Sequence, residues 1–178
     1  MLSERRDRSV DRNGAGFTIV EVLVVLVIIL VLAGLVLATS SYVHNKGARS
    51  RAEAEIAAMS AALENYKADN GIYPASATLL PTEANPANYQ TASMILFRNL
   101  TGDTDNDGQP GPGTSYMALK PNQIGGTSPA FFVKDPFGNS YGYSTVGPIG
   151  GGYNPTFDLW SSAGSITDTG KPGWIKNW

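Results

Sequence analysis

A stretch of 22 residues, 17–38, is almost wholly apolar and contains a single charge, Glu21. As a helix rising about 1.5 Å per residue it would span roughly 33 Å, the thickness of a bilayer's hydrocarbon core. The sixteen residues before it are charged, with four arginines against three acidic residues. This pattern predicts one membrane-spanning helix behind a short, net-positive leader.

The helical pattern continues beyond the apolar stretch with a change of character. Residues 46–70 are charged and alanine-rich, and apolar residues recur at spacings of 4, 3, 4 and 3. They are Ala52, Ile56, Met59, Leu63 and Tyr66. Such spacing places one apolar stripe on a helix. No proline precedes Pro74, and Asn70-Gly71 is a good stop signal. We therefore expect one helix over 17–69, about 80 Å long, whose distal half packs on other elements.

The remainder of the chain is rich in glycine, proline, serine, threonine and asparagine. Short aromatic or β-branched segments within it predict strands at 115–119, 130–133, 141–144 and 156–160. Residues 135–139 (DPFGN) predict a turn. The expected fold class is α+β, a long N-terminal helix packed on a small antiparallel sheet.

The small residues that would mark a cleavage site lie before the apolar stretch, not after it. An ordinary secretory signal is cut behind its apolar region, but here residues 14–16 (GAG) precede Phe17. Cleavage after Gly16 would remove the leader, 1–16, and leave the membrane helix, 17–38, on the mature chain. The alternative is an uncleaved signal anchor.

Glu21 favours cleavage. A carboxylate inside a membrane helix is costly, on the order of 3 kcal/mol at the centre and less near the interface, and usually has a partner. Cleavage after Gly16 creates one, the α-amino group of Phe17, which a neighbouring subunit can offer to Glu21. The alternative is a glutamate that snorkels to the interface.

Residues 16–21 (GFTIVE), followed by the apolar stretch, resemble the cleavage and methylation motif of type IV prepilins and type II secretion pseudopilins. The resemblance implies that a prepilin peptidase cuts between Gly16 and Phe17 and N-methylates Phe17. It also implies that Glu21 directs assembly, and that 39–178 form a periplasmic pilin-like domain. The family often has a proline where this chain has Ala38, which puts in doubt the helix loosening associated with that proline.

Three further stretches are similar to the major pseudopilin of type II secretion: 66–74 (YKADNGIYP), 135–141 (DPFGNSY) and 157–161 (FDLWS) with the closing 175–178 (IKNW). They cover the helix and the sheet but not 75–130. Pilus subunits often carry a C-terminal cysteine pair, and this chain has no cysteine. The resemblance therefore favours a pseudopilin over a type IV pilus subunit.

The expected function is that of a structural subunit and not an enzyme. The resemblance implies a periplasmic filament driving protein export, built from copies of this chain that are held in the bacterial inner membrane by one helix, with the C-terminal domain in the periplasm. Implied partners are the prepilin peptidase, minor pseudopilins and the inner-membrane assembly machinery. Two alternatives stay open: a type IV pilus subunit for adhesion or motility, with an extracellular filament, and a signal-anchored periplasmic calcium-binding module. The net charge of −2 and the lack of a basic, aromatic patch argue against nucleic-acid binding.

A first candidate calcium site is 102–108 (GDTDNDG). Asp103, Asp105 and Asp107 alternate and a glycine follows, as in the first half of an EF-hand loop. Thr114 stands where the closing glutamate would be, so a remote ligand is needed. The alternative is a solvated acidic turn.

A second candidate is implied by the resemblance, because major pseudopilins bind calcium in the C-terminal loop. Asp158 and Ser161 match that pattern. Ser165 stands at the next acidic position, and Asp168 is a possible substitute. Oxygen ligands favour calcium over zinc at either site, and without cysteine bound metal is one way to hold long loops together.

Overall fold

The computed structural model describes residues 16–75, 83–105, 107–109 and 111–178. The chain divides into two compact units, Met1–Val43 and His44–Trp178, called unit 1 and unit 2 below. Most of the predicted leader, residues 1–15, lies outside the described residues.

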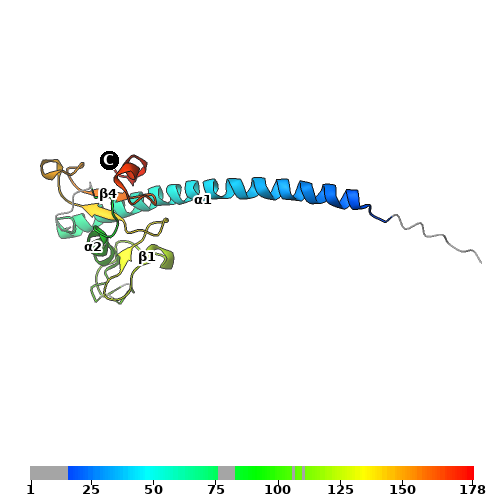
Figure 1. The fold of residues 1–178 in the computed structure, drawn as a ribbon. Helices are drawn as coiled ribbons and strands as arrows, with labels where there is room; N and C mark the ends of the chain where they lie inside the picture. The colour runs from blue at the N-terminus through cyan, green and yellow to red at the C-terminus, as the bar shows by residue number, and fades with distance from the viewer. Residues whose placement is uncertain (1–15, 76–82, 106, 110) are drawn as a thin grey trace, which may run out of the picture. The chain divides into compact units, whose positions relative to one another are not determined.

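Helix α1 runs from Ile19 to Asn70 and contributes to both units (Figure 1). It confirms the predicted helix and its stop signal. Gly71 follows in the left-handed region at φ 78°, and its N–H donates to the Lys67 carbonyl at 2.8 Å. Glycine adopts this conformation without the steric cost that a Cβ would add, so the helix ends here.

In unit 1 the described apolar side chains of α1 are exposed all round, from Ile19 to Leu37. α1 is long and apolar enough to cross a membrane, the one such helix among the described residues. A helix with apolar residues on every side needs lipid or other apolar helices around it.

In unit 2 the predicted stripe on α1 forms one wall of the core. Ala52, Ile56, Met59 and Leu63 are buried. Tyr66 is half-buried and meets the ring of Tyr116 edge-on at 5.3 Å. The stripe is therefore a packing surface, as its spacing predicted.

A second helix, α2 (Gln90–Thr101), was not expected from the sequence. It buries one face and packs on strands β2 (Phe132–Val133) and β3 (Gly142–Ser144). Ser93 also donates a buried hydrogen bond to the Val133 carbonyl at 2.8 Å. The sequence predicted only strands and a turn after Gly71, so α2 departs from that expectation.

The strands form two small antiparallel sheets. β1 (Ile124–Gly125) pairs with β2, and β4 (Asp158–Ser161) lies between β3 and β5 (Ile175–Lys176). Three short 3₁₀ helices complete the elements: η1 (Pro121–Gln123), η2 (Pro148–Gly150) and η3 (Asp168–Gly173). A long helix with small antiparallel sheets confirms the α+β class.

The strand expected at 115–119 is wrong, whereas those at 130–133, 141–144 and 156–160 correspond to β2, β3 and β4. The N–H groups of Tyr116 and Met117 both donate to the Leu100 carbonyl, at 2.8 and 2.9 Å. The segment thus provides hydrogen-bond donors for a carbonyl group in the last turn of α2 instead of pairing with a strand.

A tryptophan-centred cluster closes the core beside β4. Trp160 is fully buried, meets Tyr89 edge-on at 5.3 Å and stacks at 6.1 Å on Trp174. Gly142 is its partner across β3 and β4, and a Cβ there would lie 1.9 Å from the Trp160 ring. The glycine therefore makes room for the indole.

Candidate functional site

The predicted cleavage junction lies at the start of α1. Gly16 and Phe17 precede the helix, and the Phe17 side chain is 84% exposed. Among the described residues, nothing lies within 4 Å of the position that a Cβ would take on Gly16. Both residues are thus exposed in the described part of the chain.

Glu21 and Thr18 form a reciprocal capping box at this start. The Glu21 carboxylate accepts from the Thr18 N–H at 3.1 Å and from its hydroxyl at 3.2 Å. In return the Glu21 N–H donates to Thr18 Oγ1 at 3.2 Å. The pair satisfies two N–H groups that a helix start otherwise leaves without partners. The carboxylate also lies at the N-terminal end of α1, where an acidic side chain stabilises a helix.

The sequence reasoning missed the role of Thr18. The signal was present, because Thr-x-x-Glu before an apolar stretch is the capping-box signature. Glu21 therefore has a hydrogen-bond partner on its own chain, Thr18. Thr18 is uncharged, so the negative charge of Glu21 is not balanced by a cation there.

The structure brings the first candidate metal set together. One carboxylate oxygen each from Asp103, Asp105 and Asp107 lies within 4.8 Å of the others. Two oxygens that bind one calcium ion at about 2.5 Å can be up to about 5 Å apart. The spacing of the three groups therefore fits a single calcium ion.

The loop around these carboxylates is tightly folded. Asp103 is fully buried and accepts from the N–H groups of Asp107 and Gly108, at 3.3 and 2.9 Å. Its carboxyl group also raises the pKa of Asp105 through a side-chain hydrogen bond. A cation between the two would relieve this crowding of negative charge.

The second candidate set is divided between two loops. Asp158 accepts from the N–H groups of Tyr153 and Asn154, both at 2.8 Å. Ser161, three residues further along β4, donates to the Asp135 carboxylate at 2.6 Å. Positions 158 and 161 fall on opposite faces of a strand. The side chain of Asp168 lies outside the described residues.

Asp135 was predicted only as part of a turn. In the structure its buried carboxyl group is the hydrogen-bond acceptor for Ser161. Burial raises the pKa of its carboxyl group, and hydrogen bonds from Ser161 and the N–H groups of Asn139 and Phe137 oppose that rise. The group ties the turn to β4. Because Asp135 and Ser161 are 26 residues apart, no local pattern could have paired them.

The comparisons with known proteins agree with this geometry. Residues 11–37 match the family model described as the prokaryotic N-terminal methylation motif. The type II secretion system core protein G of Pectobacterium carotovorum subsp. carotovorum is 36% identical over 117 residues, covering 62% of this chain and 69% of the relative. That of Escherichia coli (strain K12) is 41% identical over 127 residues, covering 66% and 79%. That of Pseudomonas aeruginosa is 30% identical over 150 residues, covering 84% and 83%.

The chain belongs to the type II secretion system core protein G family. No solved structure matches the chain at a comparable level of significance. The resemblance to prepilin-like proteins, with the major pseudopilin of type II secretion as the nearest group, is confirmed. The matched methylation motif contains Gly16, Phe17 and Glu21.

Proposed function

We propose that this core protein G family member is a structural subunit of a pseudopilus, the periplasmic filament of a type II secretion system. The observation that carries the proposal is an isolated Glu21, four residues after Phe17, in the part of α1 whose described apolar side chains, from Ile19 to Leu37, are exposed all round. Such a helix is stable in lipid before assembly and among identical helices afterwards. The role is mechanical, and it requires no catalytic group.

The same proposal places the chain in the bacterial inner membrane with unit 2 in the periplasm. A net-positive leader favours a cytoplasmic N-terminus, because positive residues stay on that side. The proposed partners are further copies of this chain, the prepilin peptidase, minor pseudopilins and the inner-membrane assembly machinery. The peptidase would release residues 1–16 and methylate Phe17.

The mass of the mature chain tests this processing. We expect the purified protein to begin at N-methylated Phe17, as seen by intact mass and N-terminal sequencing. A Gly16→Leu variant should keep its leader, because a large side chain replaces the small residue at the junction. A native chain that retains Met1–Gly16, or one trimmed beyond Ala38, would contradict the proposal.

We also propose that the loop carrying Asp103, Asp105 and Asp107 binds calcium. Support comes from the 4.8 Å grouping of three carboxylate oxygens around a buried aspartate. Bound calcium would supply a cross-link that a chain without cysteine lacks. The C-terminal candidates Asp158, Ser161 and Asp168 remain the alternative set.

Removing calcium is expected to destabilise unit 2. A ligand present at a hundred times its dissociation constant stabilises a fold by about 2.7 kcal/mol. We expect the full chain in detergent to melt several degrees lower in EGTA than in millimolar calcium. The double variant Asp105→Asn/Asp107→Asn should melt at one temperature in both buffers.

Ser161→Ala is the matched control for the calcium experiment, because it changes the other candidate set and leaves the loop intact. It should keep the calcium-dependent shift. A shift that survives in Asp105→Asn/Asp107→Asn but disappears in Ser161→Ala would move the site to the C-terminal loop.

A further inference from the structure

The balance of charge on α1 changes along its length within unit 2. Its first turns carry Lys46, Arg49 and Arg51, whereas exposed Glu64 and Asp69 lie near its end. Lys67, the cation of the distal part, is already engaged by Tyr73, with Nζ 3.3 Å from the hydroxyl and 4.5 Å from the ring centroid. With Glu53 and Glu55 included, the proximal part carries three cations against two carboxylates, and the distal part carries two carboxylates against one cation. The excess charge is therefore positive at the proximal end and negative at the distal end.

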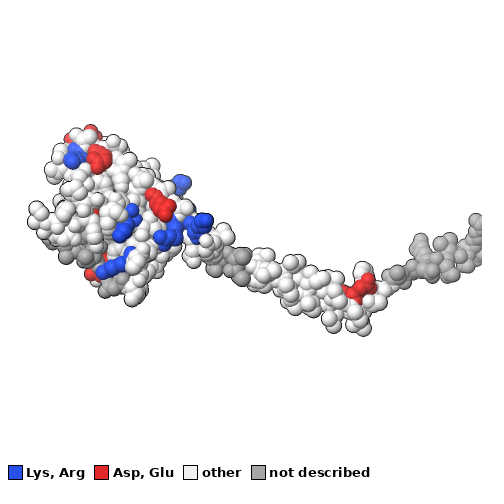
Figure 2. Space-filling view, turned by 90° about the horizontal axis from the view of Figure 1, so that it is seen from above, with Lys and Arg blue, Asp and Glu red and all other residues white. Residues whose placement is uncertain are grey.

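Neighbouring loops reinforce both ends. Arg49 donates to the Gly173 carbonyl at 2.8 Å, which brings the C-terminal segment with Lys171 beside the basic end. At the other end, a hollow lined by Tyr66, Asn70 and Thr104 places the acidic loop beside the end of α1. Figure 2 shows several Lys and Arg side chains near one end of unit 2, with an acidic side chain among them, and another basic side chain beside acidic ones at the opposite end.

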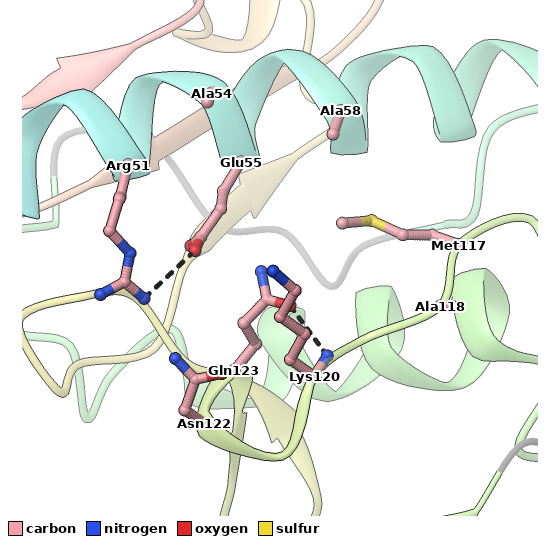
Figure 3. A pocket seen from close by; sticks show the side chains of 9 residues that line it. All are labelled: Arg51, Ala54, Glu55, Ala58, Met117, Ala118, Lys120, Asn122 and Gln123. Atoms are coloured by element: carbon pink, nitrogen blue, oxygen red, sulfur yellow. Dashed lines mark hydrogen bonds and ion pairs between the residues drawn. The ribbon is translucent and has the colours of Figure 1, made fainter.

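An open cleft of about 450 Å³ lies at the basic end, between α1 and the segment 117–123. Its lining includes Arg51, Ala54, Glu55 and Ala58 from α1, and Lys120 and Gln123 from the loop. Figure 3 shows Arg51 and Glu55 extending from α1 toward the loop, and Lys120 and Gln123 rising from the loop toward α1. Ala54 and Ala58 are small, so another chain can approach the helix closely at this point.

The cleft has a positive charge to offer, because its one carboxylate is already engaged. Glu55 accepts from the Tyr141 hydroxyl at 2.6 Å and lies 3.8 Å from Arg51. Lys120 is exposed and makes no ion pair with any described residue. The cleft therefore suits a carboxylate carried by a helix of another chain that can approach α1 closely.

We propose that this cleft receives the distal end of α1, with Asp69, from a second copy of the chain. Asp69 is exposed in the last turn of α1 and forms no ion pair within the described part of the chain. The proposal rests on the filament function proposed above. In a stack of parallel subunits every contact is heterologous, so one end of a subunit must complement the other end of a neighbour.

The distances along the helix are compatible with such a stack. Asp69 lies 18 residues after Arg51, about 27 Å along the axis at the usual rise per residue. A neighbour displaced by about this length toward the periplasm brings its cleft level with Asp69. Complementary charges then fix the register of the two subunits and exclude mismatched ones.

The absence of cysteine makes this contact directly testable. We expect filaments of the double variant Lys120→Cys/Asp69→Cys to give a ladder of disulfide-linked multimers after oxidation. Each single variant should stay monomeric, because a heterologous contact does not bring a residue against itself. Lys176→Cys/Asp69→Cys, with an exposed lysine on β5 outside the cleft, is the matched control and should give no ladder.

Charge exchange provides a second readout that does not depend on disulfide geometry. Lys120→Glu should lower filament yield by about tenfold, because it opposes two carboxylates. Adding Asp69→Lys to the same chain should restore most of that yield. These are surface changes, so the fold should persist in each variant.

The outcomes separate this proposal from the filament function itself. Normal filaments with neither a ladder nor rescue by charge exchange would overturn the docking of Asp69 in the cleft. Disulfide cross-linking of Lys120→Cys to a different protein would also overturn the docking of Asp69. The same holds if anionic vesicles protect Lys120 from amine labelling and a second copy of the chain does not. Failure of the cysteine-free parent to form any filament would instead refute the proposed function.

Discussion

Replacing Glu21 by alanine is expected to abolish filament assembly while leaving leader cleavage intact. The junction residues Gly16 and Phe17 are unchanged, so the peptidase should still release the leader. The new Phe17 amine of each subunit, however, would enter the helix stack without its carboxylate. Leaving a buried charge unpaired costs about 3–5 kcal/mol, equivalent to a loss of about a hundredfold or more in association. Immunoblots of sheared filaments and the mass of the membrane-bound chain measure the two effects separately.

Glu21→Gln distinguishes the charge from the capping box. Glutamine can still accept from the Thr18 N–H and so preserves the start of α1. If the charge directs assembly, Glu21→Gln should fail as Glu21→Ala does. Normal filaments from Glu21→Gln would show that helix capping, and not charge pairing, is what assembly requires.

Replacing Trp160 by alanine is expected to lower the free energy of unfolding of unit 2 by about 3–5 kcal/mol. The indole is fully buried and contacts Tyr89 and Trp174. It also covers Gly142, which has no side chain to fill the space left behind. Urea unfolding of the full chain in detergent, followed by circular dichroism, measures the loss.

Trp178→Ala is the matched control, because Trp178 also belongs to the aromatic cluster but is only partly buried. Its loss of stability should be clearly smaller. Equal effects of the two substitutions, or a change below about 1 kcal/mol for Trp160→Ala, would mean that the cluster does not anchor the sheet.

The parts of the fold that the sequence predicts well are those that depend on local signals. The apolar stretch, the stripe from Ala52 to Leu63 and the Asn70-Gly71 stop together define α1 within a residue or two. Helix α2 has weaker signals. Its N-cap, Tyr89, makes no side-chain capping bond, and the helix is short. Its stability comes from packing on β2 and β3, which a sequence pattern does not contain.

For the strands and the candidate sites too, features that depend on local signals were predicted and features that depend on distant contacts were not. Tyr116 has strand propensity, but the nearby Leu100 carbonyl accepts from the N–H groups of Tyr116 and Met117. Alternate spacing did predict that Asp103, Asp105 and Asp107 converge. The pairing of Asp135 with Ser161 joins distant segments and becomes visible only after folding.

The burial of the α1 stripe in unit 2 bears on how the chain is degraded. Ala52, Ile56, Met59 and Leu63 supply one wall of a core whose strands are only two to four residues long. A protease that cuts before His44 leaves that wall in place and releases a folded unit 2. A cut between Ala52 and Leu63 removes the wall, and sheets this small do not persist alone in water. We therefore expect proteolysis before His44 to leave a folded fragment, and proteolysis between Ala52 and Leu63 to unfold what remains of the core.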